Sequence, residues 1–195
     1  PELLAETFFE TNAALRDQIE DPEEEGRSTV FAAGGESISE LLVEGDFDAT
    51  NGYPTEVAVS VIIEAGDLPL NPDSFTPESA SLSALISELN TDIKASNQDV
   101  SFVYDAVENA IVGSVGLDEV VRIDIDTANV GKNVELTLTT TLTMPIDHVP
   151  SVGGGNVALV DDQVVVRFDI TGVDSGGNPI RSPISASVTI VDGSD

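Results

Sequence analysis

The chain has 195 residues, and 36 acidic against 7 basic side chains give it a formal net charge of −29. A surface this acidic repels phosphate, and no stripe of basic residues interrupts it, so nucleic acid and anionic membrane surfaces are excluded as partners. No apolar run reaches the roughly 20 residues that span a bilayer, so we expect no membrane insertion. The chain is 41% apolar, which predicts a packed core, and it has no cysteine, which excludes disulfides and cysteine-bound zinc.

Residues 1–27 are predicted to be a lead-in or linker segment, and residues 28–195 to be a β-sandwich domain. The lead-in has an apolar pattern near helical spacing, which indicates a short amphipathic helix. The acidic run 21–25 then ends this pattern. Four apolar residues carry the helical spacing: Leu4, Phe8, Leu15 and Ile19.

From residue 28 the apolar pattern changes to the period of two that is typical of strands. The longest alternation is 134–142, where every second residue up to Leu138, and then Leu142, is apolar. This segment predicts one buried face and one Thr-rich wet face. The predicted strands are 30–32, 38–43, 56–63, 100–104, 110–112, 120–125, 134–142, 164–170 and 184–191.

One helix is predicted after the Pro-rich loop 66–79, with Ser79 or Ser81 as its N-cap. Its apolar residues repeat at i, i+3, i+4 and i+7. Many short strands, one short helix and frequent turns predict an all-β fold, an Ig- or cadherin-like β-sandwich with an N-terminal extension. The repeating apolar residues of the helix are Leu82, Leu85, Ile86 and Leu89.

The single histidine, His148, follows Asp147 in the sequence Pro-Ile-Asp-His. A His beside an Asp suggests an acid–base pair, but a hydrolase would also need an activated nucleophile. The motifs G-x-S-x-G, G-x-G-x-x-G and the P-loop are missing from the sequence. We therefore expect His148 to fix a corner or a strand end, and we expect the chain not to be an enzyme.

Carboxylates in loops are the best candidates for a binding site, because calcium takes about six to eight oxygen ligands. One acidic loop places carboxylates at alternate positions from residue 44 onward, and others lie between or after strands. Each of these loops is either an oxygen cage for calcium or a solvated turn. The predicted calcium ligands are Glu44, Asp46, Asp48, Asp161, Asp174, Asp192 and Asp195.

Residues 98–195 resemble a tandem-repeat domain of the giant RTX-type adhesins that Gram-negative bacteria export by type I secretion. The most specific shared element is the Pro-Ile-Asp-His corner at 145–148, and the likeness is looser over 28–97. The remaining shared segments are V-S-F-V-Y-D at 100–105, I-V-G at 111–113, V-V-R-I-D-I at 120–125, the strand at 136–142, D-I-T at 169–171, the loop at Asp174 and V-T-I-V-D-G at 188–193.

The resemblance implies an extender or split β-sandwich module that holds calcium in its loops and linkers at the bacterial cell surface. Its implied role is structural, carrying ligand-binding domains for adhesion and biofilm formation. The implied partners are neighbouring domains of the same adhesin, and host or biofilm surface ligands. The Asp174 loop, D-S-G-G-N, has fewer Asp residues than many modules of this family. The alternative is a module that itself binds a carbohydrate or a peptide.

Overall fold

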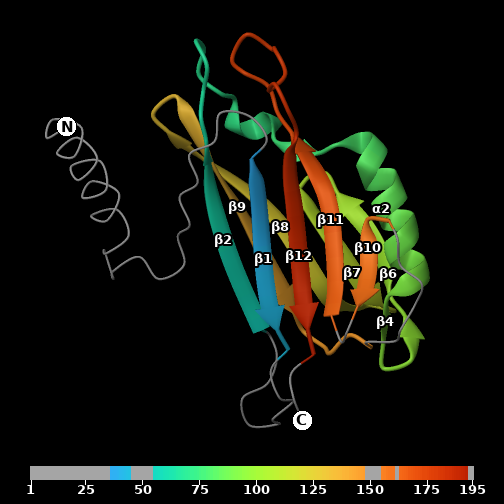
Figure 1. Ribbon diagram of the computed structural model, residues 1–195. Helices are drawn as coiled ribbons and strands as arrows, with labels where there is room; N and C mark the ends of the chain where they lie inside the picture. Colours follow the sequence, from blue (N-terminus) through green and yellow to red (C-terminus); the bar gives the residue numbers. More distant parts are fainter. Residues whose placement is uncertain (1–35, 45–54, 148–154, 161–162, 193–195) are drawn as a thin grey trace, which may run out of the picture.

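The period-two segments of the sequence form the strands of two packed β-sheets in the computed structural model (Figure 1). The structure describes residues 36–44, 55–147, 155–160 and 163–192. The predicted all-β sandwich with one helix is confirmed in this part of the chain. The predicted lead-in 1–27 and the predicted strand 30–32 lie outside the described residues.

The first sheet has the strand order β1-β12-β11-β10, and the short β3 pairs with the end of β11. Strand β1 runs parallel to β12, and the other pairs are antiparallel. The polypeptide thus starts β1 at the upper end of the sandwich in Figure 1 and finishes both β1 and β12 at the lower end. The strands are β1 (Ser37–Val43), β3 (Thr76–Pro77), β10 (Val157–Val160), β11 (Gln163–Thr171) and β12 (Ile184–Val191).

The second sheet is antiparallel throughout, with the order β2-β9-β8-β7-β6. The predicted alternation of β9 is confirmed, since Val134, Leu136, Leu138 and Leu142 are buried, but Thr140 is buried with them. The strands are β2 (Thr55–Ile63), β6 (Ser101–Asp105), β7 (Ala110–Val115), β8 (Asp118–Val130) and β9 (Asn133–Leu142).

The α-helix of the described residues, α2 (Ser79–Asp92), covers the side of the sandwich where β10 and β6 form the sheet edges (Figure 1). Two residues of the helix itself, Leu85 and Leu89, have buried side chains. The predicted caps are wrong, because Ser79 is already helical and the N-cap is Glu78. The Ser81 hydroxyl donates to the Glu78 carbonyl at 3.0 Å instead of accepting from a helix amide.

Short elements flank the helix, namely the 3-10 turn η1 (Pro72–Ser74) and the two-residue strands β4 (Lys94–Ala95) and β5 (Gln98–Asp99). Strand β10 was not among the predicted strands, because its four residues V-A-L-V are too few to show an alternation. In the described part of the chain, no helix is long and apolar enough to cross a membrane.

Candidate functional site

The parallel pairing of β1 with β12 brings two of the predicted calcium ligands to the same place. Val43 pairs with Val191, and the amide of the next residue, Glu44, donates to the Val191 carbonyl at 2.9 Å. Asp192 follows Val191 directly. Glu44 and Asp192 are therefore neighbours at the lower end of the sandwich, although 148 positions separate them in the sequence.

The Glu44 side chain points inward and is only 4% exposed. Its Oε1 atom accepts a hydrogen bond from the Ile146 amide at 2.9 Å. This bond joins the end of β1 to the corner that follows β9. Glu44 is thus an anchor for the Pro-Ile-Asp corner, with one carboxylate oxygen already engaged by the backbone.

The same corner is held from its other side by the β4–β5 hairpin. The Asp147 amide donates to the Lys94 carbonyl at 2.8 Å, and the Asn97 amide donates to Asp147 Oδ2 at 2.6 Å. Ser96 and Asn97 both have positive φ angles, as a two-residue hairpin turn of this kind requires. The Asp147 carboxylate therefore caps a turn, which is a structural use of the most specific motif in the sequence.

Asp174 lies at the opposite, upper end of the sandwich and organises its own loop (Figure 1). Its Oδ1 accepts from the amides of Gly176 at 2.8 Å and Asn178 at 2.9 Å. Hydrogen bonds from the Asn178 side chain, and then from these amides, lower the pKa of the Asp174 carboxyl. The structure therefore separates Asp174 from the pair formed by Glu44 and Asp192.

The remaining predicted ligands, and His148 with them, lie outside the described residues: Asp46, Asp48, Asp161 and Asp195. Among the described residues, no group of three or more Asp, Glu or His side chains is arranged to hold a metal ion. The calcium site stays a prediction, and Glu44 and Asp192 are the two predicted ligands that the structure brings together.

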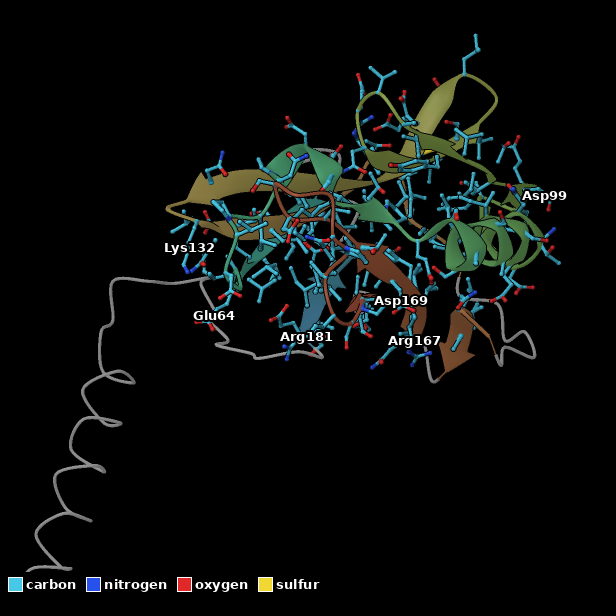
Figure 2. All side chains as sticks on the ribbon, turned by 90° about the horizontal axis from the view of Figure 1, so that it is seen from above. Glu64, Asp99, Lys132, Arg167, Asp169 and Arg181 are labelled. Carbon is cyan, nitrogen blue, oxygen red and sulfur yellow. The ribbon has the colours of Figure 1, made fainter. Side chains whose placement is uncertain are left out.

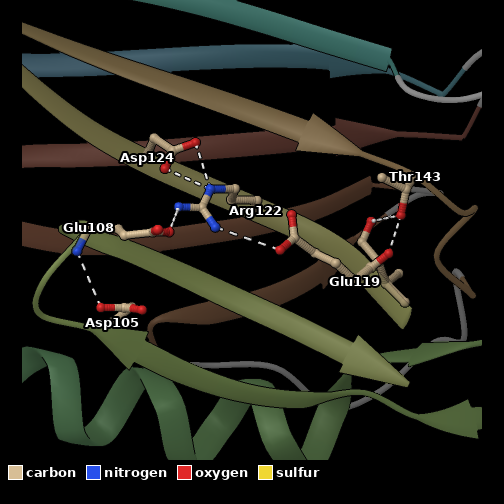
Figure 3. A network of polar contacts seen from close by, with 7 residues as sticks. Asp105, Glu108, Glu119, Arg122, Asp124 and Thr143 are labelled. Carbon is tan, nitrogen blue, oxygen red and sulfur yellow. Dashed lines mark hydrogen bonds and ion pairs between the residues drawn. The ribbon is translucent and has the colours of Figure 1, made fainter. Parts of the chain in front are cut away.

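Other acidic side chains are neutralised by an arginine on the outer face of β8 (Figure 3). Arg122 Nε donates to Asp124 Oδ1 at 2.8 Å, and its terminal nitrogens contact Glu108 and, at 3.6 Å, Glu119. The hydrogen bond to Glu108 is the largest cause that raises the pKa of Arg122 above its usual value. This cluster uses its carboxylates for a salt-bridge network, so we do not assign it a metal.

Sequence reasoning missed two of the three buried glutamates in and directly beside β1. Glu36, Glu40 and Glu44 are 8%, 2% and 4% exposed, and with Thr140 they are the only buried polar or charged side chains among the described residues. Their spacing of four puts them on one strand face with the core residues Ile38 and Leu42. Because all five residues occupy even-numbered positions of one alternating segment, the sequence itself indicated that the glutamates share the buried face with Ile38 and Leu42.

Glu40 is the least satisfied of the three. Its Oε2 accepts a hydrogen bond from the Thr140 hydroxyl on β9. Its Oε1 is the one buried side-chain oxygen or nitrogen without a hydrogen-bond partner among the described residues. Burial raises the pKa of the Glu40 carboxyl, and the weaker opposing effect comes from hydrogen bonds with Thr140.

A pocket of about 380 Å³ opens at the upper end of the sandwich. Its walls come from the start of β1, the segment after β2 and the loop between β11 and β12. Ile63, Leu70 and Ile180 supply apolar surface, while Glu64 and Arg181 supply opposite charges. Figure 2 looks down on this end and shows Glu64 and Arg181 over the same side of the sandwich.

No protein-family model, curated protein or solved structure matches this chain.

Proposed function

We propose that this chain is a calcium-stabilised structural module of a bacterial cell-surface adhesin, which extends or scaffolds ligand-binding domains outside the cell. The resemblance of residues 98–195 to RTX-type adhesin repeats suggests this role. The observation that carries the calcium part is the meeting of Glu44 and Asp192 at the lower end of the sandwich.

The sequence adds further carboxylates to this pair. Asp46 and Asp48 follow Glu44 within four residues, Asp195 follows Asp192 within three, and Asp161 precedes Gln163, which pairs with Val191. Calcium prefers such hard oxygen ligands, and several carboxylates repel one another unless a cation lies between them. The sequence therefore adds carboxylates close to the strand ends where Glu44 and Asp192 meet, and calcium would neutralise their charge.

The proposed mechanism is mechanical. Where free calcium is low, repulsion among the carboxylates disfavours the folded module and keeps the chain loose enough for export. Outside the cell, calcium binds the folded state and stabilises it by RT ln(1 + [L]/Kd), about 2.7 kcal/mol at a hundredfold excess over Kd. A stiff sandwich, in which β1 starts at the upper end and β12 finishes at the lower end, then spaces its neighbours.

The test is thermal unfolding of the chain in calcium, in magnesium and in chelator. We expect calcium to raise the unfolding midpoint more than magnesium, because magnesium keeps its water and demands a stricter geometry. The double variant Glu44→Gln/Asp192→Asn should lose most of the calcium response. Gln at position 44 keeps an oxygen for the Ile146 amide, so the corner itself is preserved.

The matched control is Asp126→Asn, an exposed carboxylate on β8 away from the lower end. It removes one charge and should leave the calcium response unchanged. A midpoint that is the same in calcium and in chelator would refute the calcium part of the proposal. An equal loss of response in the control would mean that only the total charge matters.

Direct ligand binding is the second candidate, and the pocket at the upper end favours it. Sugar sites use exposed aromatic rings, and none of the residues lining this pocket is aromatic. A short peptide fits the lining better, with apolar side chains on Ile63, Leu70 and Ile180 and its charged groups near Glu64 and Arg181.

This candidate is tested by titrating a short-peptide library into the isotope-labelled chain and following backbone NMR shifts. Binding at the pocket would shift residues 63–70 and 174–182, and Arg181→Ala would weaken it. Arg167→Ala, an exposed arginine on β11, is the control. Shifts that are scattered over the surface, or that persist in Arg181→Ala, would contradict a peptide site here.

A further inference from the structure

Strand β1 differs from the other long strands in what its inner face carries. Glu40 occupies an inward position between Ile38 and Leu42, where the other strands place apolar residues or Thr140. Within the described part of the chain, β1 is also an edge strand, with β12 as its one hydrogen-bonded neighbour. A buried carboxyl group therefore sits on a strand that has one hydrogen-bonded neighbour.

The surroundings of Glu40 offer an ionised carboxylate little compensation. The inward-facing residues of the strands packed around it are uncharged, and its hydrogen-bond donor is the Thr140 hydroxyl. The other titratable groups on this inner face are Glu36 and Glu44, which flank β1 and lie four residues from Glu40 on either side. The uncharged neighbours are Ala186, Val188 and Ile190 on β12, Val57, Val59 and Val61 on β2, and Leu138, Thr140 and Leu142 on β9.

A neutral acid is the form of Glu40 that this site accommodates. Placing a charge in an apolar interior without a counter-ion is far more costly than placing a neutral carboxyl there. The partnerless Oε1 atom is where the negative charge would be least compensated. When β1 leaves the sandwich, the same carboxylate regains water and ionises without this penalty.

We propose that β1 is a pH-dependent latch, which is docked while the Glu40 carboxyl is protonated and loosened when that carboxyl ionises. The proton goes to solvent, and the strand separates from β12 and from Thr140 while the second sheet stays folded. The observations behind this inference come from the described residues and do not include the proposed calcium site or adhesin role.

The direction of the pH effect follows from linkage. The pKa of docked Glu40 is raised, by burial, above its ordinary value of 4.5, so docked β1 holds its proton to a higher pH than released β1 does. Docking is strongest below the ordinary value and weakens as pH rises toward the raised pKa. Within that window one proton is lost on release, so the docking equilibrium changes by about tenfold per pH unit.

The experiment is hydrogen exchange of the whole chain between pH 5 and 8, expressed as protection factors so that the intrinsic pH dependence of exchange cancels. We expect the protection of β1 amides to fall by up to about tenfold per pH unit in the lower part of this range. The amides of β8 and β9 should keep their protection. In Glu40→Gln, β1 should stay protected at every pH.

The matched control is Glu56→Gln on β2. Glu56 also faces a threonine hydroxyl, that of Thr141 at 3.4 Å, but it is exposed to solvent. This variant should keep the pH dependence of the wild-type chain. The 13C shift of the Glu40 carboxyl supplies a second readout that needs no variant, and its titration midpoint should lie above 4.5.

Four results would overturn the latch. One is a β1 protection profile that is the same in the wild-type chain and in Glu40→Gln. Another is a loss of protection that strikes β1, β8 and β9 together, since that reports global unfolding. The third is a Glu40 carboxyl that titrates at its ordinary value. The fourth is a Glu56→Gln variant that flattens the profile as Glu40→Gln does.

Discussion

The two sides of this sandwich close their sheet edges in different ways. On one side, helix α2 lies against the edge strands β10 and β6 and also contacts β11. On the other side, the edge strands β1 and β2 lie side by side, with no helix of the described residues over them (Figure 1). An open strand edge exposes unpaired backbone groups and invites pairing with other chains, so each side needs a means of protection.

The helix side satisfies its edges with side chains. Asn90 pairs with both backbone groups of Phe102 on β6, accepting from the amide at 2.6 Å and donating to the carbonyl at 3.3 Å. Glu88 accepts from the Val157 amide on β10 at 2.9 Å. The helix thus presents polar groups where a neighbouring strand would have been.

The β1 side uses buried carboxyl groups instead. The outer face of β1 carries no charge, and its Leu41 is 59% exposed, so this face does not discourage edge pairing. The inward glutamates do, because wrong pairing of β1 would bury their carboxyl groups without suitable partners. The helix side is thus protected by side chains that satisfy the edge backbone groups. The β1 side is protected by carboxyl groups, one of which has an oxygen without a hydrogen-bond partner.

The largest expected effect comes from breaking the helix side at its core. Leu89 is 1% exposed beneath α2, and Leu89→Ala would leave a cavity that the packed strands cannot fill. We expect the free energy of unfolding to fall by about 2–5 kcal/mol, measured by chemical denaturation. Leu68→Ala, a truncation at a partly exposed loop leucine, should cost much less. A loss of stability in Leu89→Ala that is as small as the loss in Leu68→Ala would mean that the packing of α2 contributes little to stability.

The second effect concerns the polar pair on the β1 side. Thr140→Val removes the hydroxyl that donates to Glu40, and we expect it to cost about 1–3 kcal/mol at pH 5, where β1 is docked. The double variant Glu40→Leu/Thr140→Val replaces both partners by apolar groups of similar shape. Its stability should equal or exceed that of the wild-type chain, so the two substitutions are strongly non-additive. If denaturation experiments instead show additive losses, the buried Glu40 carboxyl does not lower the stability of the wild-type chain.

This polar pair also shows how far the sequence predicts the structure. The alternation of 134–142 predicts the buried face of β9, because the period of two is a local property of the chain. Glu40 and Thr140 each place a polar side chain at an inward position of an otherwise apolar alternation. The reason becomes clear only in the folded structure, where the two side chains are hydrogen-bonded to each other. Local sequence patterns therefore predict the strands, but they do not predict which side chains of two strands contact each other.

The candidate site depends on pairing that is still more distant in the sequence. Glu44 and Asp192 become neighbours because β1 pairs in parallel with β12. A parallel pair is not joined by a short hairpin turn, so no local sequence signal predicts this pairing. The helix was predicted correctly from its apolar repeat, whereas the predicted N-caps, Ser79 and Ser81, were wrong. The Ser81 hydroxyl bonds a carbonyl rather than an amide, and several serines offer the same local chemistry.

A smaller effect is expected when the β6 edge is uncovered. Asn90→Ala removes both side-chain bonds to Phe102 and should cost about 1 kcal/mol. It should also raise the hydrogen-exchange rate of the Phe102 amide while the β7 and β8 amides stay protected. Thr91→Ala, at the next helix position and without a bond to β6, is the control. An unchanged Phe102 amide would show that the helix backbone alone shields this edge.

The smallest effect separates charge from hydrogen bonding at β10. Glu88→Gln keeps an oxygen that accepts from the Val157 amide, so we expect a loss of only about 0.5 kcal/mol or less, while Glu88→Ala should cost about 1 kcal/mol. Denaturation of both variants at low and high salt supplies the measurement. If the bond itself protects this edge, the difference between Gln and Ala persists in salt, because salt screens charge and leaves a neutral hydrogen bond intact. If Gln and Ala cost the same, the carboxylate charge is what matters, and the two sides of the sandwich are then more alike than their geometry indicates.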